Sequence, residues 1–168
     1  MASGKLKVDG ETILFEAGTQ HNEATVTITG DRLVIKSGAA SKEYALPSAG
    51  TWLLNLQNDT LIGGYQSFGE AATRESKITQ DQLQQRMDSL KQLMVGANVS
   101  AARKNFFLPP QELKLISTAD NAILVGPFKG MPASLQPDND GKIPEVFKFV
   151  SNKDARETLD RLERLLKQ

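Results

Sequence analysis

The chain has 168 residues, 39% of them hydrophobic and 24% charged, with 20 basic and 20 acidic side chains and no cysteine. This composition is typical of a globular protein, and the length suits one domain with a hydrophobic core. The lack of cysteine excludes disulfides, thiolate nucleophiles and zinc–thiolate sites, and the balanced charge without a basic cluster argues against nucleic acid as a partner.

Residues 5–66 carry the pattern of an antiparallel β-sheet. Apolar residues alternate with threonine in Ala24-Thr25-Val26-Thr27-Ile28-Thr29, which predicts a strand with one buried face. Turn residues at Asp9-Gly10, Gly30-Asp31 and Ser37-Gly38 separate the strand segments by too few residues for helical crossovers. We therefore expect consecutive strands to pair as hairpins.

Two helices are predicted, one over about 79–95 and one over about 152–167. Thr79 and Gln82 match a capping box at the start of the first helix, and either Ser151 or Asn152 can cap the second. The second helix carries an apolar stripe made of Ala155, Leu159, Leu162 and Leu166. We expect this stripe to be buried against the sheet, with the charged residues on the opposite side facing water.

Further strands are expected over about 105–150, with a connection rich in proline and glycine at 126–144. The alternation in Val146-Phe147-Lys148-Phe149-Val150 predicts the last of these strands. No run of about 18 apolar residues occurs in the chain, so no transmembrane segment is predicted.

In the connection 126–144, the part from Gly126 to Pro137 is unusually apolar, and it is the candidate interaction surface of the sequence. Prolines stiffen it, and exposed apolar side chains held in this way would form an ordered surface for a protein partner. The alternative is a loop that covers the core. The candidate contact residues are Phe128, Met131 and Leu135, together with Phe106 and Phe107.

No catalytic, cofactor-binding or metal-binding constellation is recognised in the sequence. His21 is the one histidine, and it lies in a polar stretch that is predicted to be a turn, so neither an imidazole metal site nor a Ser-His-Asp arrangement is expected. Glu11, Glu16 and Glu43 lie on or next to predicted strands, where ordinary surface charge explains them. The separation of these carboxylates, on which glycoside hydrolysis depends, is not given by the sequence.

Two glycine-containing motifs are also rejected as ligand sites. The stretch from Gly63-Gly64 to Gly69 lacks the Lys and Ser/Thr of a Walker loop and the spacing of a dinucleotide fingerprint, so it is interpreted as a strand that runs into a loop. Aligning Gly141 with the glycine of an EF-hand puts Gln136 and Phe147 where Asp and Glu are required. Asp138 to Gly141 is therefore predicted to be a turn.

The second half of the chain resembles uncharacterised bacterial cell-envelope lipoproteins. The resemblance is carried by 87–93, 96–100, Gly126-Pro127-Phe128, Pro132 and 144–149. It implies residence outside the cytoplasm behind a removed leader, and it implies no known reaction. The chain lacks the lipid-bearing cysteine with which such proteins start.

The sequence thus predicts one α+β domain over 1–168, with a largely antiparallel, curved or barrel-like sheet packed by the two helices. The expected function is a non-catalytic binding or structural module, with no cofactor and with a protein as its partner. Its expected location is the periplasm or cell envelope, or alternatively the cytoplasm. A pleckstrin-homology-like lipid- or peptide-binding domain and a hydrolase that uses carboxylates are the alternatives. The oligomeric state is left open.

Overall fold

The computed structural model describes residues 4–9, 12–17, 22–66, 79–119, 121–126, 132 and 134–167. The chain divides into two compact units, Met1–Ala49 and Gly50–Gln168. The predicted α+β class is confirmed, because antiparallel and mixed sheets are combined with one helix in the middle and one at the end of the chain. The division into compact units does not test whether they unfold together, so the single-domain prediction over 1–168 stays a prediction.

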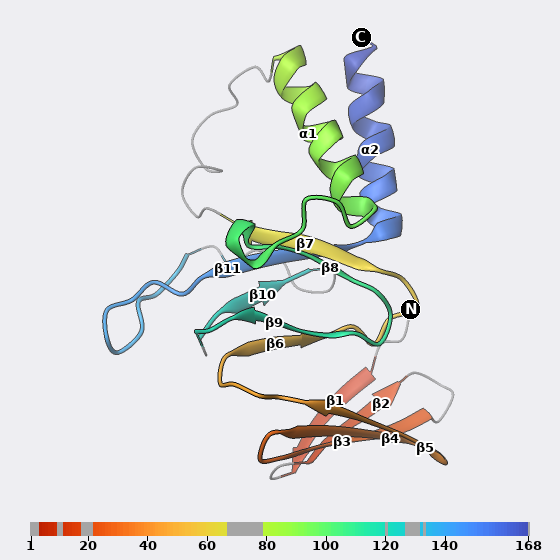
Figure 1. The fold of residues 1–168 in the computed structure, drawn as a ribbon, viewed down its shortest axis with the longest axis vertical. Helices are drawn as coiled ribbons and strands as arrows, with labels where there is room; N and C mark the ends of the chain where they lie inside the picture. Colours follow the sequence, from red (N-terminus) through yellow and green to blue (C-terminus); the bar gives the residue numbers. More distant parts are fainter. Residues whose placement is uncertain are drawn as a thin grey trace. The chain divides into compact units, whose positions relative to one another are not determined.

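The first unit is a five-stranded antiparallel meander in which each strand pairs with the next (Figure 1). Its strands are β1 (Gly4–Asp9), β2 (Thr12–Ala17), β3 (Asn22–Thr29), β4 (Arg32–Ser37) and β5 (Ala40–Ala45). The pairs Thr29↔Arg32 and Ser37↔Ala40 close two-residue turns, in which Gly30 and Gly38 adopt φ of 59° and 58°. Positive φ at these positions matches the twist of a tight hairpin, so the predicted hairpins form here for a local reason.

The second unit contains two sheets and both helices. Its strands are β6 (Thr51–Leu54), β7 (Leu61–Gln66), β8 (Asn105–Leu108), β9 (Leu113–Ser117), β10 (Ile123–Val125) and β11 (Val146–Ser151). The four-stranded sheet has the order β10-β11-β7-β8, in which only the β10–β11 pair is parallel, and β6 pairs with β9 in a separate sheet. The described strands thus form open sheets rather than one closed barrel.

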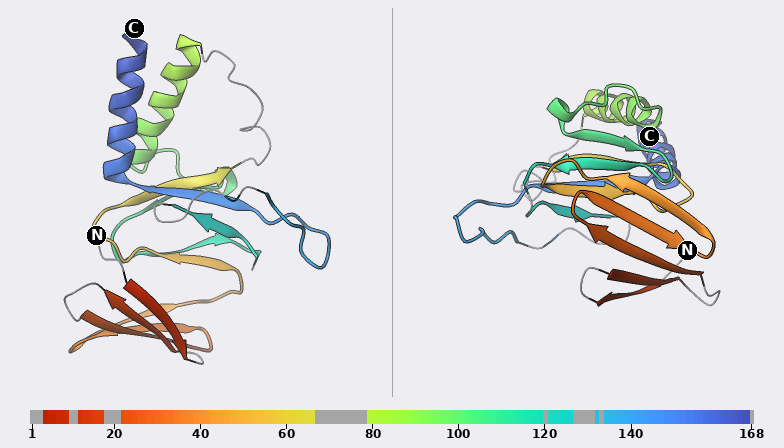
Figure 2. Two further views of the ribbon diagram at one scale, coloured as in Figure 1. Left: turned by 180° about the vertical axis from the view of Figure 1, so that it is seen from behind. Right: turned by 60° about the horizontal axis from the view of Figure 1, so that its bottom comes forward.

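The core of the second unit lies between its two sheets. Figures 1 and 2 show β6 and β9 on one side of the layer formed by β7, β8 and β11. The buried core side chains are Leu61, Phe106, Leu108, Ile116, Phe147 and Phe149. The rings of Phe106 and Phe147 meet edge to face with their centroids 5.9 Å apart, a favourable arrangement of aromatic quadrupoles. The alternation that predicted the last strand therefore directs its phenylalanines into this core.

The two helices, α1 (Gln80–Met94) and α2 (Asn152–Leu166), stand side by side on the other side of the four-stranded sheet and project away from it (Figure 1). The predicted capping box is confirmed: the hydroxyl of Thr79 accepts from the Gln82 N–H, and the Gln82 side chain accepts from the Thr79 N–H. Ser151 caps α2 by accepting from the N–H of Asp154.

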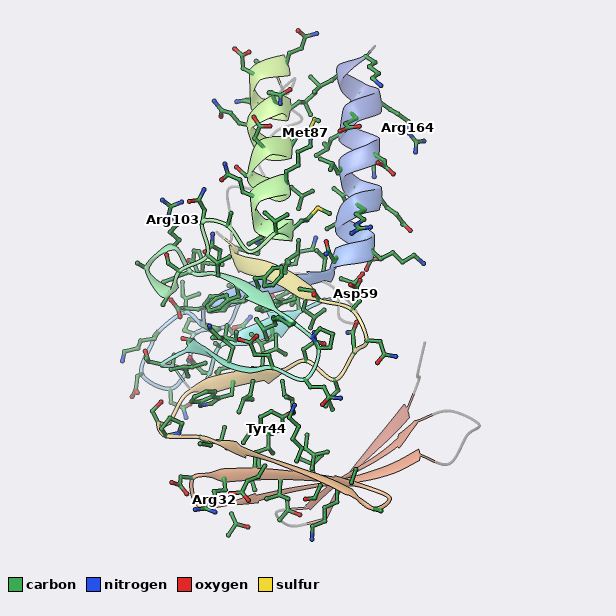
Figure 3. The ribbon with its side chains drawn as sticks, turned by 45° about the vertical axis from the view of Figure 1, so that its right-hand side comes forward. Arg32, Tyr44, Asp59, Met87, Arg103 and Arg164 are labelled. Carbon is green, nitrogen blue, oxygen red and sulfur yellow. The ribbon has the colours of Figure 1, made fainter. Side chains whose placement is uncertain are left out.

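The helices pack mainly on each other, which corrects the expectation that the stripe of α2 is buried against the sheet. Figure 3 shows Met87 of α1 on the side toward α2, and this side chain is buried. An ion pair of 3.4 Å between Lys91 and Glu163 also joins the helices. Ala155, near the end of α2 that meets the sheet, is fully buried, whereas Leu162 further along is half-buried. Because α2 rises away from the sheet, most of its stripe faces α1.

Candidate binding groove

A groove of about 310 Å³ opens between α1 and the face of the four-stranded sheet that lies opposite the core. Its lining is predominantly apolar and comes from α1, β7, β8 and β11. The lining residues are Ile62, Gly63, Gly64, Gln66, Leu90, Leu93, Asn105, Lys148 and Val150. A cavity of this size lies at the lower end of the range usual for small-molecule sites.

The floor of the groove is formed by two glycines inside β7. Gly64 pairs with Lys148 of β11 on one side and with Asn105 of β8 on the other. A Cβ on Gly64 would lie 2.7 Å from the carbonyl oxygen of Lys104, and one on Gly63 would collide with the carbonyl oxygen of Lys148. Close approach of the neighbouring strands therefore requires glycine at both positions, and it leaves a floor of backbone without side chains.

The walls of the groove are aliphatic. Leu90 and Leu93 reach it from the last turns of α1, and both are half-buried. Ile62 is fully buried and Val150 is half-buried on the sheet side. Because α1 packs on α2, it projects away from the sheet instead of lying flat upon it. The space between the last turns of α1 and the sheet therefore stays open.

The polar side chains of the lining differ in whether they already make hydrogen bonds or ion pairs within the protein. Asn105 is engaged twice, because its Oδ1 accepts from the Ser100 N–H and its Nδ2 donates to the Asn98 carbonyl, each at 2.9 Å. Gln66 donates to the carbonyl oxygen of Gly64 at 3.2 Å. Lys148 is exposed and makes no ion pair with any described residue. It is also the one charged side chain among the lining residues.

A second polar cluster lies apart from the groove lining and is locked by its own contacts. Lys104 forms an ion pair with Oε1 of Glu145, and the hydroxyl of Ser117 donates to Oε2 at 2.6 Å. The hydrogen bond from Lys104, followed by that from Ser117, lowers the pKa of the Glu145 carboxyl below its usual value. The Ser117 hydroxyl also accepts from the Ala119 N–H at 3.1 Å. A carboxylate held ionised in this way is a weak base, so this arrangement fits a structural tie better than an activated nucleophile.

The structure separates the residues of the interaction surface predicted from the sequence. Phe106 is buried in the core at 3% exposure, so its assignment to an accessible surface is wrong. It occupies an inward position of β8, and strand alternation decides this. Phe107 is half-buried on the other face of β8, where a Cβ on Gly96 would lie 3.4 Å from its ring, and Leu135 is half-buried as well. Phe128 and Met131 lie outside the described residues, and their part of the hypothesis stays a prediction.

The other residues considered for chemistry are placed as follows. His21 and Glu11 lie outside the described residues, as does the side chain of Glu16, so the predictions for them stay predictions. Glu43 is exposed on β5 and pairs with Arg32 of β4 at 2.7 Å. The predicted turn at Asp138 forms, because its Oδ1 accepts from the N–H groups of Asp140 and Lys142. Within the described parts of the chain, no group of three acidic or imidazole side chains is placed to hold a metal ion.

The groove was not predicted from the sequence, although the sequence carries two signals for it. Gly63 and Gly64 lie within β7, not in a loop, and glycine inside a strand pattern often marks a close approach of backbone. Lys148 alternates with Val146 and Val150, which puts a single charge on an otherwise apolar strand face. Neither signal reveals that a helix lies above that face.

The fold and the groove together define an α+β protein with an open apolar site between one helix and a sheet. Comparison of the chain with protein-family models, with curated proteins and with solved structures finds no match. Neither of the two helices in the described residues is long and apolar enough to cross a membrane.

Proposed function

We propose that this protein is a non-catalytic binding module of the bacterial cell envelope, and that the groove between α1 and the four-stranded sheet is its ligand site. The observation that carries the proposal is the groove itself, which has aliphatic walls, a glycine floor and one charge that no described residue pairs with. Ligand sites are commonly concave and apolar with a few polar groups that fix the orientation of the ligand.

The polar cluster at Glu145 supports a binding role over a catalytic one. A general base needs a pKa near the working pH, and the contacts of Glu145 move its pKa in the opposite direction. The hydrolase alternative would need a second carboxylate facing Glu145 or Glu43, and Glu43 instead faces Arg32 across the β4–β5 pair. The pleckstrin-homology-like alternative rests on a barrel, and the described strands form open sheets.

The assignment to the cell envelope rests on the resemblance of the second half of the chain to envelope lipoproteins. Two of the segments that carry the resemblance, 87–93 and 144–149, contribute Leu90, Leu93 and Lys148 to the groove. The site and the resemblance therefore involve the same elements. Fractionation of the cells that produce the protein tests this part: recovery in the cytoplasmic fraction would contradict it.

A neutral apolar fluorophore such as Nile red tests the binding site. We expect the protein to bind it with increased emission, and we expect Leu93→Gln to weaken binding about tenfold because a polar amide replaces an aliphatic wall. The matched control is Leu165→Gln on the exposed side of α2, which lies outside the groove and should leave binding unchanged. Circular dichroism verifies that both variants fold. Absence of binding, or equal binding by both variants, would reject the groove as the ligand site.

A further inference from the structure

We propose that the groove takes an unbranched aliphatic chain that ends in a carboxylate, the chemistry of a fatty acid, and that Lys148 contacts the carboxylate. This inference rests on the proposed function, because it names the ligand class for the same groove. The position of Lys148, the shape of the groove floor and the charge of the lining support this ligand class.

Lys148 lies at an inner position of the sheet, between β7 and β10. Its strand neighbours on the same face, Val146 and Val150, are aliphatic, and Val146 is fully buried. A lysine in such surroundings lays its methylene stem along apolar surface and holds its ammonium group at the edge of the water. A ligand that follows the groove with its apolar part therefore meets a positive charge where the groove opens.

The floor favours a slender ligand. Gly64 shares the face of Ile62 and Lys148 and removes a side chain from the middle of β7, so a chain in the groove can lie against backbone between Ile62 and Leu93. At Gly63 and Gly64, β7 lies between β11 on one side and β8 on the other, so neither edge of this part of β7 is open. Strand addition by a peptide is therefore blocked at the floor, and apolar contact is what the floor offers. The modest volume of about 310 Å³ favours a single chain.

The charge of the lining selects the head group. Among the described lining residues, Lys148 is the one cation, and none is an aspartate or glutamate. One ammonium group balances one carboxylate, whereas a phosphate monoester carries up to two negative charges at neutral pH and is preferentially held by an arginine fork or several donors. The unpaired state of Lys148 among the described residues leaves it available for this contact.

Isothermal titration calorimetry with octanoate, 1-octanol and octyl phosphate tests the inference. We expect octanoate to bind about fivefold more tightly than octanol, the upper end of what a partly exposed ion pair contributes, and more tightly than octyl phosphate. Affinity should rise about fourfold for each methylene from hexanoate to octanoate, in line with burial of the chain. The preference for octanoate over octanol should shrink as ionic strength increases.

Variants assign the head-group contact. Lys148→Met keeps the apolar stem and removes the charge, so it should lower octanoate affinity about fivefold and leave octanol affinity unchanged. Lys148→Arg should restore the preference for octanoate. Lys142→Met, an exposed lysine outside the lining, is the control and should change neither affinity.

The possible failures are distinguishable. Equal affinity for octanoate and octanol, tighter binding of octyl phosphate, or an unchanged preference in Lys148→Met would overturn the fatty-acid inference while binding of Nile red still upholds the groove as a ligand site. Binding of Nile red without binding of octanoate would also overturn it. If Nile red fails to bind as well, the proposed function falls together with this inference.

Discussion

Asn55 shows how one buried polar side chain organises the second unit. It is fully buried, and its Nδ2 donates to the carbonyl oxygens of Asp59 and Leu108 at 2.8 and 2.9 Å. Its Oδ1 accepts from the N–H of Gln57 at 3.0 Å. The side chain therefore bonds three backbone groups, and it fixes the turn between β6 and β7 against the end of β8. The end of β7 that leads into the groove floor is positioned by this turn.

Glu145 links β11 to the turn before β8, and its effect on stability depends on pH. Its carboxyl has a lowered pKa in the folded state, first because of Lys104 and then because of Ser117. A carboxyl whose pKa is lower in the folded state stabilises the fold above its unfolded value near 4.5, and this contribution is lost as the pH falls through the folded value.

We predict that Glu145→Gln destabilises the protein at neutral pH and that its difference from the original protein shrinks below about pH 4.5. The free energy of unfolding, measured by urea denaturation at a series of pH values, checks this. Glu157→Gln on the exposed side of α2 is the control, and its difference from the original protein should stay small at every pH. A Glu145→Gln difference that is constant or grows toward acid pH would contradict the assignment.

At the scale of elements, the helix pair owes its position to the start of α2 and to the packing of α2 on α1. Asp59 precedes β7, and its Oδ2 accepts from the N–H of Lys153 at 2.9 Å, which puts a carboxylate at the positive end of the helix dipole (Figure 3). The Asn152 N–H donates to the Thr60 carbonyl at 2.8 Å. The start of α2 is thus anchored to the turn that Asn55 orders, and the remainder of the helix packs on α1.

In the contact between the two helices, the buried Met87 of α1 should contribute more to the free energy of unfolding than the half-buried Leu162 of α2. Met87 is buried, so Met87→Ala should lower the free energy of unfolding by about 2–4 kcal/mol. Leu162 is half-buried, so Leu162→Ala should cost only about 1–2 kcal/mol. Leu165→Ala, at a residue that is 45% exposed, is the control and should cost less than about 1 kcal/mol. Chemical denaturation measures all three. A loss for Leu162→Ala that equals that for Met87→Ala would show that the stripe of α2 is more deeply buried than the structure indicates.

At the scale of the whole molecule, the two units differ in how they gain stability. The aromatic and aliphatic core cluster belongs entirely to the second unit. Among the first-unit residues whose side chains are described, Leu33 is the one buried apolar residue. A single sheet buries less apolar surface by itself than two packed layers do. The single-domain prediction requires the first unit to unfold together with the second.

The single-domain prediction therefore implies one cooperative unfolding transition. Trp52, the only tryptophan, lies in β6 of the second unit and reports on that unit through its fluorescence, whereas far-ultraviolet circular dichroism reports on both units. The two signals should have the same urea midpoint. A phase of the dichroism at lower urea, with unchanged fluorescence, would show that residues 1–49 unfold as a separate domain.

The parts of the fold that the sequence predicted are those decided by neighbours along the chain. The capping box at Thr79 and the glycines at 30 and 38 act within a few residues of themselves, so the start of α1 and the hairpins of the first unit could be predicted. The same holds for Ser151 at the start of α2 and for the alternation along β11. In each case the backbone hydrogen bonds or the turn geometry are set by adjacent residues.

The tertiary structure alone decided which surfaces meet and therefore where the candidate site lies. Trp52 pairs with Leu115, and Gly64 pairs with both Asn105 and Lys148, across separations that no local pattern encodes. These pairings bury Phe106, put Lys148 and Gly64 on the face toward α1, and leave the stripe of α2 to pack on a helix. The physical reason is that alternation along a strand assigns residues to two faces, whereas long-range strand pairing and helix packing determine what covers each face.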